Sequence, residues 1–306
     1  MKAEVEALVD ELKRLRKAGV SRVNVSEDAI RALKQFAKAP QLDEATRTQV
    51  LESIPEQVRS ANASDFDEVF KASKTEVKKK AVRAGQGAKL PRPPSVTLPE
   101  GDKKTRWEAL RDMVLNCRVC NQHVKPGKKV VFGVGNIDAD IFFCGEAPGA
   151  DEEIQGEPFV GKAGQLLTKM IQAMGLQRED VYIGNIMNWR PEMPTPTGNR
   201  PPTLEEMNFC LPYLKAQVAV VQPKLIVALG ATAVKGLLGA DSFRSLRDVK
   251  GQWQEFEGVP VMPTYHPSYL LRNDTKRDKR AAWEDWLKVM EKAGLPISER
   301  QQGFFL

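Results

Sequence analysis

From residue 140 onward, four short apolar runs alternate with segments of helical periodicity. The runs cover residues 140–144, 181–185, 224–229 and 259–265. Apolar strands that alternate with helices predict a parallel sheet whose faces are covered by those helices. We therefore expect an α/β fold with three layers, in which a central four-stranded parallel sheet is flanked by helices.

Each apolar run ends in residues that are suited to ligand contact. They are GEAPG at 145–149, Asn185, Gly230 and His266. The loop from Gly145 to Gly164 holds five glycines between a strand and a helix, so its backbone N–H groups can approach a ligand near the positive end of the helix. Because the carboxyl ends of parallel strands share one edge of a sheet, we expect the four run ends to line one crevice.

These residues also carry a resemblance to a known family. The motifs, in chain order, are GEAPG with GEPFVGKAGQLL at 156–167, YIGN at 182–185, GNRPPT at 198–203, VALGATA at 227–233 and HPSYLLR at 266–272. In this order, over residues 110 to 292, the chain resembles the family 4 uracil-DNA glycosylases, bacterial and archaeal enzymes that bear an iron–sulfur cluster. The resemblance implies a base excision repair hydrolase that flips uracil out of DNA, cleaves its N-glycosidic bond and leaves an abasic site.

The resemblance also implies roles for single residues that would contact the base. Phe159 would stack on the flipped base, beside Gly145, and His266 would donate a hydrogen bond to the uracil oxygen that gains charge as the bond breaks. The amide of Asn185 can pair with both an N–H and a carbonyl of one base edge, which distinguishes uracil from cytosine. A core phenylalanine and a turn asparagine are the ordinary alternatives for two of these residues.

Contacts to the DNA strand are expected just after the histidine. Leu270 matches the side chain that enters the duplex as a wedge in the family, and Ser268 and Arg272 are placed to meet phosphate. A leucine at this position could equally dock the following helix.

The group that activates water stays open. Better-known glycosylase families carry an aspartate in the first motif at the position of Ala147, and no carboxylate stands there in this chain. Glu146 and Glu152 are the candidate catalytic carboxylates. The alternative is a dissociative path in which uracil departs largely before water attacks.

Three of the four cysteines match positions that hold the cluster in the family. The resemblance implies metal ligands at Cys117, Cys120 and Cys210, and a fourth cysteine where Trp189 stands. An indole does not bind iron, so a complete four-cysteine 4Fe–4S site cannot form from these positions.

Three possibilities for a cofactor follow from this incomplete set. The first is a 4Fe–4S cluster with a non-cysteine ligand such as His123 or Glu192. The second is zinc held by the three cysteines and His123. The third is a metal-free domain with relict cysteines. It is less expected than a bound metal, because three thiols seldom meet at such positions by accident.

The rest of the chain divides by composition. Residues 1–72 show amphipathic helical patterns without a catalytic motif, 73–106 form a basic linker with proline and glycine, 107–296 form the glycosylase-like domain, and 297–306 form a tail. Residues 71–106 hold eleven Lys or Arg against three acidic residues, while the whole chain carries +6. We expect the linker to be disordered, and either to bind a polyanion or merely to be solvated.

The expected partner is uracil-containing DNA, double- or single-stranded, and the partner of the N-terminal region is unknown. Because neither a signal peptide nor a membrane-spanning run is evident, we expect a cytoplasmic protein. We further expect it to be a monomer of bacterial type that associates with the nucleoid. Competing functions are a glycosylase of other base range, such as hypoxanthine, and a non-catalytic DNA-binding module. A covalent DNA-trapping branch of the superfamily carries a KRRIH insertion, whereas this chain has GNRPP.

Overall fold

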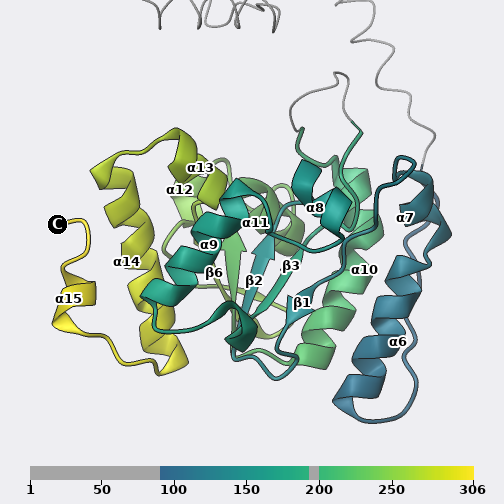
Figure 1. The fold of residues 1–306 in the computed structure, drawn as a ribbon, viewed down its shortest axis with the longest axis horizontal. Coiled ribbons are helices and arrows are strands. Elements are labelled where there is room, and N and C mark those ends of the chain that lie inside the picture. The colour runs from purple at the N-terminus through teal and green to yellow at the C-terminus, as the bar shows by residue number, and fades with distance from the viewer. Residues whose placement is uncertain (1–89, 193–199) are drawn as a thin grey trace, which may run out of the picture. The chain divides into compact units, whose positions relative to one another are not determined.

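The computed structural model describes residues 90–192 and 200–306 (Figure 1). The chain divides into two units, Met1–Gly85 and Gln86–Leu306, and the described residues belong to the second. The predicted helical region at 1–72 and the first part of the predicted linker lie outside the described residues.

A six-stranded mixed sheet forms the centre of the second unit, in the order β1-β3-β2-β4-β6-β5. Its parallel strands are β2 (Ile141–Gly145), β3 (Tyr182–Asn185), β4 (Leu225–Leu229) and β6 (Val259–Thr264). This confirms the predicted α/β class and its four parallel strands. The sheet is wider than predicted because β1 (Val134–Gly135) and β5 (Gln254–Phe256) add one short antiparallel strand at each edge.

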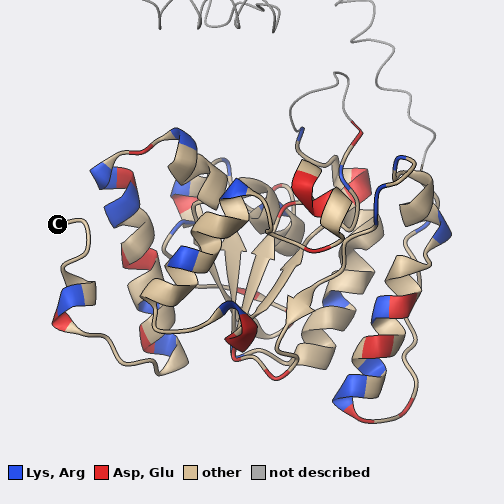
Figure 2. Ribbon diagram, viewed as in Figure 1, with Lys and Arg blue, Asp and Glu red and all other residues tan. Residues whose placement is uncertain are grey.

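Helices cover both faces of this sheet and make three layers. Phe142 and Cys144 of β2 pack into one core, which includes residues of α10 (Leu204–Val221) and α11 (Ala231–Leu238). Ile141 and Phe143 face the opposite core, which includes residues of α9 (Lys162–Ala173) and α14 (Lys276–Ala293). Figure 2 shows that the parallel strands carry no charged residue, as expected for strands that are buried on both faces.

A third core lies where α6 (Lys103–Leu115), α7 (Arg118–Gln122) and α10 meet the segments around residues 130–132 and 187–189. We call these two helices and the residues packed between them and α10 the α6–α7 lobe. Leu90, Val96 and Leu98 pack against this core, and Asp102 caps α6 by accepting from Thr105 N at 2.7 Å. The predicted linker therefore extends too far, because from Leu90 its residues already belong to the folded unit.

The remaining elements are short and close the fold around the sheet. They are α8 (Ala150–Gln155), η1 (Arg178–Asp180), α12 (Leu246–Val249), α13 (Pro267–Arg272) and α15 (Glu299–Gln302). In Figure 1 the arrows of the parallel strands point toward the edge at which α8 and α13 lie. Among the described helices, none combines the length and the apolar character that a bilayer crossing requires.

A buried ion pair ties α14 to the end of β6. Lys250 Nζ lies 2.8 Å from Asp285 Oδ2, and the hydroxyl of Thr264 donates to the same oxygen at 2.7 Å. Burial raises the pKa of Asp285, while the hydrogen bond from Lys250 opposes that shift. Thr264 is the last residue of β6, so this pair fixes the strand end from which the chain continues to His266.

Candidate active site

Gly145 and Asn185 end neighbouring parallel strands and are direct partners in the β2–β3 register. A Cβ atom at position 145 would lie 2.5 Å from the ring of Phe159 and would also collide with Oδ1 of Asn185. Only glycine leaves room for both side chains. Two residues that are 26 positions apart in the sequence, Phe159 and Asn185, therefore meet above the end of β2. We call Gly145, Phe159, Asn185 and His266 the carboxyl-edge cluster.

Asn185 presents a hydrogen-bond acceptor that the protein leaves unused. Its side chain is 6% exposed, and its Oδ1 has no hydrogen-bond partner among the described residues. Leaving a buried acceptor unpaired costs about 1–3 kcal/mol, so such an atom needs an explanation in a native structure. A ligand N–H placed between Asn185 and Phe159 would satisfy this oxygen.

Phe159 is held in a backbone conformation that bulky residues rarely adopt, with φ at 55°. A Cβ on Gly164 would overlap the Phe159 carbonyl, so the glycine lets the following helix α9 press against this turn. Glu152 holds the other side, because its Oε1 accepts from Val160 N at 3.0 Å and Gly161 N at 2.9 Å. A strained turn that several contacts over-determine is typical of a functional site.

The same contacts bear on the predicted role of Glu152 as a catalytic carboxylate. One of its oxygens accepts two backbone hydrogen bonds in the Phe159 loop, so its observed work is to shape that loop. Sequence analysis had no signal for this, since the two N–H donors lie eight and nine residues further along.

His266 caps the N-terminus of α13 and stacks on Phe159, with ring centroids 5.6 Å apart and planes at 29°. Its Nδ1 accepts from Ser268 N at 3.1 Å and lies 2.8 Å from Ser268 Oγ. A backbone N–H can only donate, so the proton of the neutral ring is on Nε2. Burial, with a smaller contribution from the charge of Arg272, lowers the pKa of His266 to about 4.

Glu146 follows Gly145 directly and is half-buried. Burial raises the pKa of its carboxyl, while a hydrogen bond with Thr232 and the charge of Arg272 oppose that shift. Sequence analysis missed Thr232, although it lies inside the VALGATA motif, in the first turn of α11. A hydroxyl in the first turn of the helix after β4 is the signal that could have pointed to it.

The residues predicted to contact DNA lie on α13, and one of them, Leu270, is buried. Leu270 is 5% exposed, whereas Leu271 is 48% exposed. Neighbouring helix residues point about 100° apart, so one leucine packs inward while the next faces solvent. A side chain that enters a duplex must be accessible, so this packing favours Leu271 over the predicted Leu270 for the wedge role.

Ser268 and Arg272 differ in what they already contact. Both the N–H and the hydroxyl of Ser268 engage the imidazole of His266, so this serine orients the ring. Arg272 is exposed at the end of α13, and its charge acts on both His266 and Glu146.

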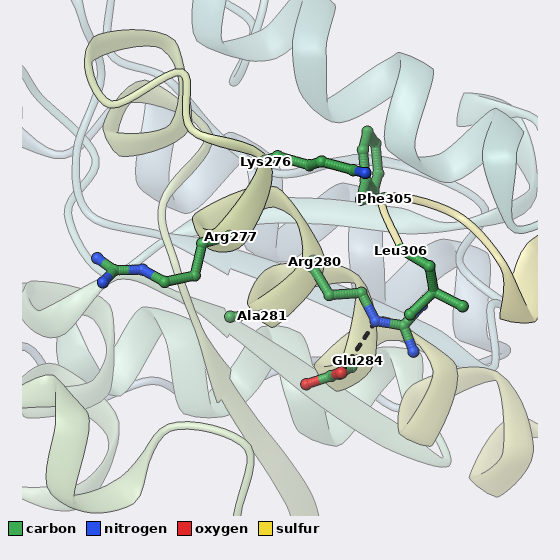
Figure 3. Close-up of a pocket in the computed structure, with 7 residues that line it drawn as sticks. All are labelled: Lys276, Arg277, Arg280, Ala281, Glu284, Phe305 and Leu306. Carbon is green, nitrogen blue, oxygen red and sulfur yellow. Dashed lines mark hydrogen bonds and ion pairs between the residues drawn. The ribbon is translucent and has the colours of Figure 1, made fainter.

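A hollow of about 410 Å³ lies between the first turns of α14 and the C-terminal residues (Figure 3). Its lining consists of Lys276, Arg277, Arg280, Ala281, Glu284, Phe305 and Leu306. None of the predicted site residues contributes to it. Arg280 is already engaged with Glu284 at 2.9 Å and with the carbonyls of Gln302 and Phe304. The hollow thus follows from the way the tail packs on α14.

The three predicted metal ligands gather in the α6–α7 lobe. Cys117 caps α7 by accepting from Cys120 N at 3.5 Å. Cys120 and Cys210 are fully buried. Across residues 90–192 and 200–306, no group of three or more His, Cys, Asp or Glu side chains is arranged to hold a metal ion.

Trp189 occupies the position at which the family resemblance implies a fourth cysteine. It is fully buried, stacks on His123 with centroids 5.0 Å apart and planes at 12°, and meets the edge of Phe209 at 5.9 Å. A four-cysteine cluster needs four thiolates. These residues supply three, and an indole lies at the fourth position, so they do not fit that cluster.

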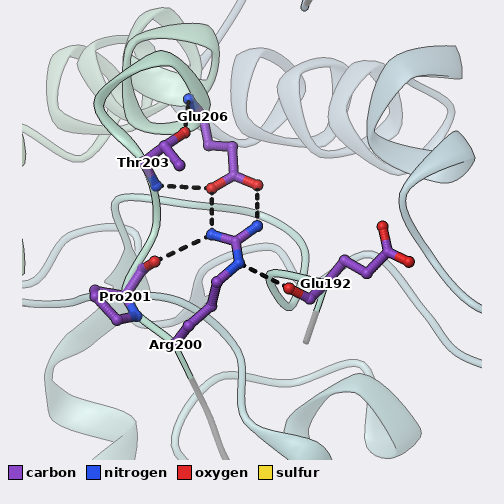
Figure 4. A network of polar contacts seen from close by, with 5 residues as sticks. All are labelled: Glu192, Arg200, Pro201, Thr203 and Glu206. Carbon is purple, nitrogen blue, oxygen red and sulfur yellow. Dashed lines mark hydrogen bonds and ion pairs between the residues drawn. The ribbon is translucent and has the colours of Figure 1, made fainter. Parts of the chain in front are cut away.

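Glu192, the other alternative ligand, is exposed and belongs to a different network (Figure 4). Its backbone carbonyl accepts from Nε of Arg200 at 2.7 Å, and Arg200 makes two further bonds of 2.7 Å to the carboxylate of Glu206. Glu206 completes a capping box with Thr203 at the start of α10. Arg200 thus joins the residues that flank 193–199 to the helix that carries Cys210.

Comparison with known proteins adds a family match. Residues 132–287 match the model of the uracil DNA glycosylase superfamily. The chain is 42% identical over 179 residues to a type-4 uracil-DNA glycosylase of Thermotoga maritima. The aligned region covers 58% of this chain and 90% of that protein. It is 41% identical over 196 residues to the type-4 enzyme of Archaeoglobus fulgidus, covering 61% and 94%, and 40% identical over 176 residues to that of Pyrobaculum aerophilum, covering 56% and 87%.

Proposed function

The chain belongs to the uracil DNA glycosylase superfamily, and from this premise we infer that it is a DNA repair hydrolase that excises uracil, with its active site at the carboxyl-edge cluster. The observation that carries the location of the site is the buried, unpaired Oδ1 of Asn185 beside the ring of Phe159. The packing of the sheet and the helices gives no reason for an unsatisfied acceptor at this point. A bound base with a free N–H would supply the missing donor.

Base recognition follows from the chemistry of the pairing edges. Uracil presents an N–H donor between two carbonyls, so the amide of Asn185 can accept from the N–H and donate to one carbonyl. Cytosine presents a ring nitrogen that only accepts, which would oppose the unpaired Oδ1. Phe159 adds an aromatic surface for stacking, worth about 1–3 kcal/mol per base.

His266 stabilises the departing base in this proposal. The N-glycosidic bond breaks with negative charge moving onto the uracil, and a donor that is fixed in advance stabilises that charge. The ring is neutral with its proton on Nε2, so it donates a hydrogen bond without first gaining a proton. Ser268 keeps the ring in this tautomer by donating to Nδ1.

Glu146 is the carboxylate that we assign to the water. It is half-buried next to Gly145, and burial raises the pKa of its carboxyl, whereas Glu152 is engaged with two backbone N–H groups. A raised pKa is a common property of a general base. Water thus adds to the sugar carbon as its bond to uracil breaks, the carboxylate of Glu146 takes the proton of that water, and uracil leaves as an anion that accepts the hydrogen bond from His266.

DNA contacts extend from α13 in this proposal. Arg272 meets a phosphate, and Leu271 replaces Leu270 as the side chain that enters the duplex. The partner is uracil-containing DNA, and the enzyme works as a monomer at the bacterial nucleoid in the cytoplasm.

Release of bases from matched oligonucleotides tests this function. We expect the full chain to release uracil from single- and double-stranded DNA, but to leave hypoxanthine and thymine. Asn185→Ala should slow uracil release by at least about 100-fold, because the paired edge of the base is lost. Gln217→Ala is the matched control, since Gln217 is also a buried amide but bonds Tyr182 and Tyr213 on the α10 side of the sheet. Uracil release at the wild-type rate by Asn185→Ala, or no base release by the wild type, would refute the proposal.

A further inference from the structure

We propose that Trp189 replaces the iron–sulfur cluster in this chain, so that the α6–α7 lobe is held together by an indole-centred apolar core and folds without iron. The inference goes beyond the proposed uracil chemistry, because it concerns how the lobe beside the site is stabilised. It accounts for the one position at which the chain departs from the expected ligand set.

The first observation is where Trp189 lies. Its core contains two of the retained cysteines, Cys120 and Cys210, and the third, Cys117, packs against it. The indole is fully buried in that core, between the ring of His123 and the edge of Phe209. The side chain therefore lies among the residues that a cluster would need.

The second observation is what the sulfur atoms contact. Cys117 Sγ accepts from Cys120 N in α7, and the side chains of Cys120 and Cys210 are fully buried in the apolar core that holds Trp189. His123, the remaining candidate ligand, lies with its ring face against the indole. Indole N–H only donates, and that of Trp189 has no partner among the described residues, so this side chain cannot complete a metal site.

The third observation is that hydrogen bonds and an ion pair fix the residues on either side of Trp189. Asn188, next to Trp189, exchanges two hydrogen bonds with Val131, at 2.7 Å through the backbone and 3.0 Å through its amide. Arg190 pairs with Glu153 of α8 at 2.9 Å, and both side chains are largely buried. Tryptophan buries about 150–250 Å² of surface, so it contributes packing at a place where a cluster would contribute bonds.

Iron and sulfide analysis of the full chain tests the proposal directly. The protein is purified without oxygen from iron-supplemented cells and then treated with ferrous iron and sulfide under reducing conditions. We expect substoichiometric iron, no visible charge-transfer absorption, and a melting temperature that a strong chelator leaves unchanged. Stoichiometric iron and sulfide with that absorption, or a melting temperature that the chelator lowers, would overturn the proposal. The chelator arm also detects zinc.

The variant Trp189→Cys asks whether the indole is what displaces the cluster. It restores a fourth thiol, and we expect it to take up iron and sulfide under the same treatment. A Trp189→Cys protein that keeps its near-ultraviolet circular dichroism but takes up no iron would overturn the displacement.

A second pair of variants tests the role of the indole in holding the lobe. Trp286 is the matched control, because it is equally buried and its indole N–H also lacks a partner, but it packs in the core between α9 and α14. Trp189→Ala should abolish hydrogen-exchange protection in residues 103–122, whereas Trp286→Ala should spare that segment. Equal loss of protection in both variants, or none in Trp189→Ala, would show that the indole does not hold the lobe.

Discussion

Replacing His266 by glutamine tests whether the neutral imidazole is the working state of the site. Burial and Arg272 lower the pKa of His266 to about 4, whereas a histidine in an unfolded chain has a pKa of about 6.5. A difference of about 2.5 units at about 1.36 kcal/mol per unit corresponds to about 3.4 kcal/mol. Between these two pH values the unfolded chain binds a proton that the folded chain does not.

The direction of the effect on stability follows from this difference. The wild type has its full stability above about pH 6.5, and the free energy of unfolding falls as the pH drops toward about 4. His266→Gln keeps a polar side chain but has no titrating group. Relative to this variant, the wild type should therefore lose up to about 3 kcal/mol as the pH falls from about 7 to about 4.

Urea unfolding at several pH values between about 7 and 4.5 measures the difference, because the other titrating groups are common to both proteins. Arg272→Gln should shrink the effect, since removal of the positive charge lets the pKa of His266 rise. Parallel pH profiles for the wild type and His266→Gln would refute the argument that a buried, neutral ring occupies this position.

The rate of uracil release gives the kinetic side of the same argument. A ring that is already neutral does not change charge between about pH 5 and 8, so the factor lost in His266→Gln should be constant over that range. A factor that shrinks as the pH rises through about 6.5 would mean that the imidazolium is the active form.

Three further substitutions have distinct expected outcomes. Leu271→Ala should slow uracil release from duplex DNA more than from single strands, and equal effects on both substrates would contradict the wedge role. Leu270→Ala, by contrast, should lower the free energy of unfolding by about 2–5 kcal/mol. Gly164→Ala places a methyl group against the Phe159 carbonyl and should cost about 1–3 kcal/mol and weaken substrate binding, so an unchanged melting temperature would count against the close contact. Asp285→Ala leaves a buried ammonium unpaired and should cost about 3–5 kcal/mol in urea unfolding; a cost below 1 kcal/mol would show that the pair is solvated.

The parallel core of the sheet could be predicted because its signals are local. Each parallel strand is an apolar run with a turn or polar residue at its end, and helices separate the runs. The edge strands β1 and β5 have two and three residues, which is too short for any periodic pattern. The boundary of the folded unit was placed too late because residues 90–102 form no helix or strand, and their proline-rich composition conceals three packed side chains.

The positions of the site residues along the chain were readable, but their contacts were not. That Glu152 serves the backbone of the Phe159 loop depends on how the chain folds back on itself. That Leu271 and not Leu270 faces solvent depends on the packing of α13, and a pair of adjacent leucines carries no sign of which one turns outward. Burial and hydrogen bonding decide both questions, and these properties exist only in the folded chain.

The segment that leaves β3 connects the carboxyl-edge cluster to the core of the α6–α7 lobe. Asn185 stands at one end and Trp189 four residues later. Backbone hydrogen bonds hold the residues between them, from Ile186 N to Gly145 O at 3.0 Å, from Met187 N to Glu146 O at 3.2 Å, and from Val131 N to Asn188 O at 2.7 Å. The amide of Asn185 and the core of the α6–α7 lobe are therefore two ends of one short, fixed segment.

This connection gives a physical reason for a large, rigid side chain at position 189. If the lobe core loosens, the segment can shift, and a displacement of about 1 Å at a reacting group can cost about 100-fold in rate. Trp189→Ala should consequently slow uracil release although Trp189 touches no base, and Trp286→Ala, at a similar loss of global stability, should slow it less. If both variants kept the wild-type rate while folded, Asn185 would have to be positioned by β3 alone, and the lobe would matter for stability but not for catalysis.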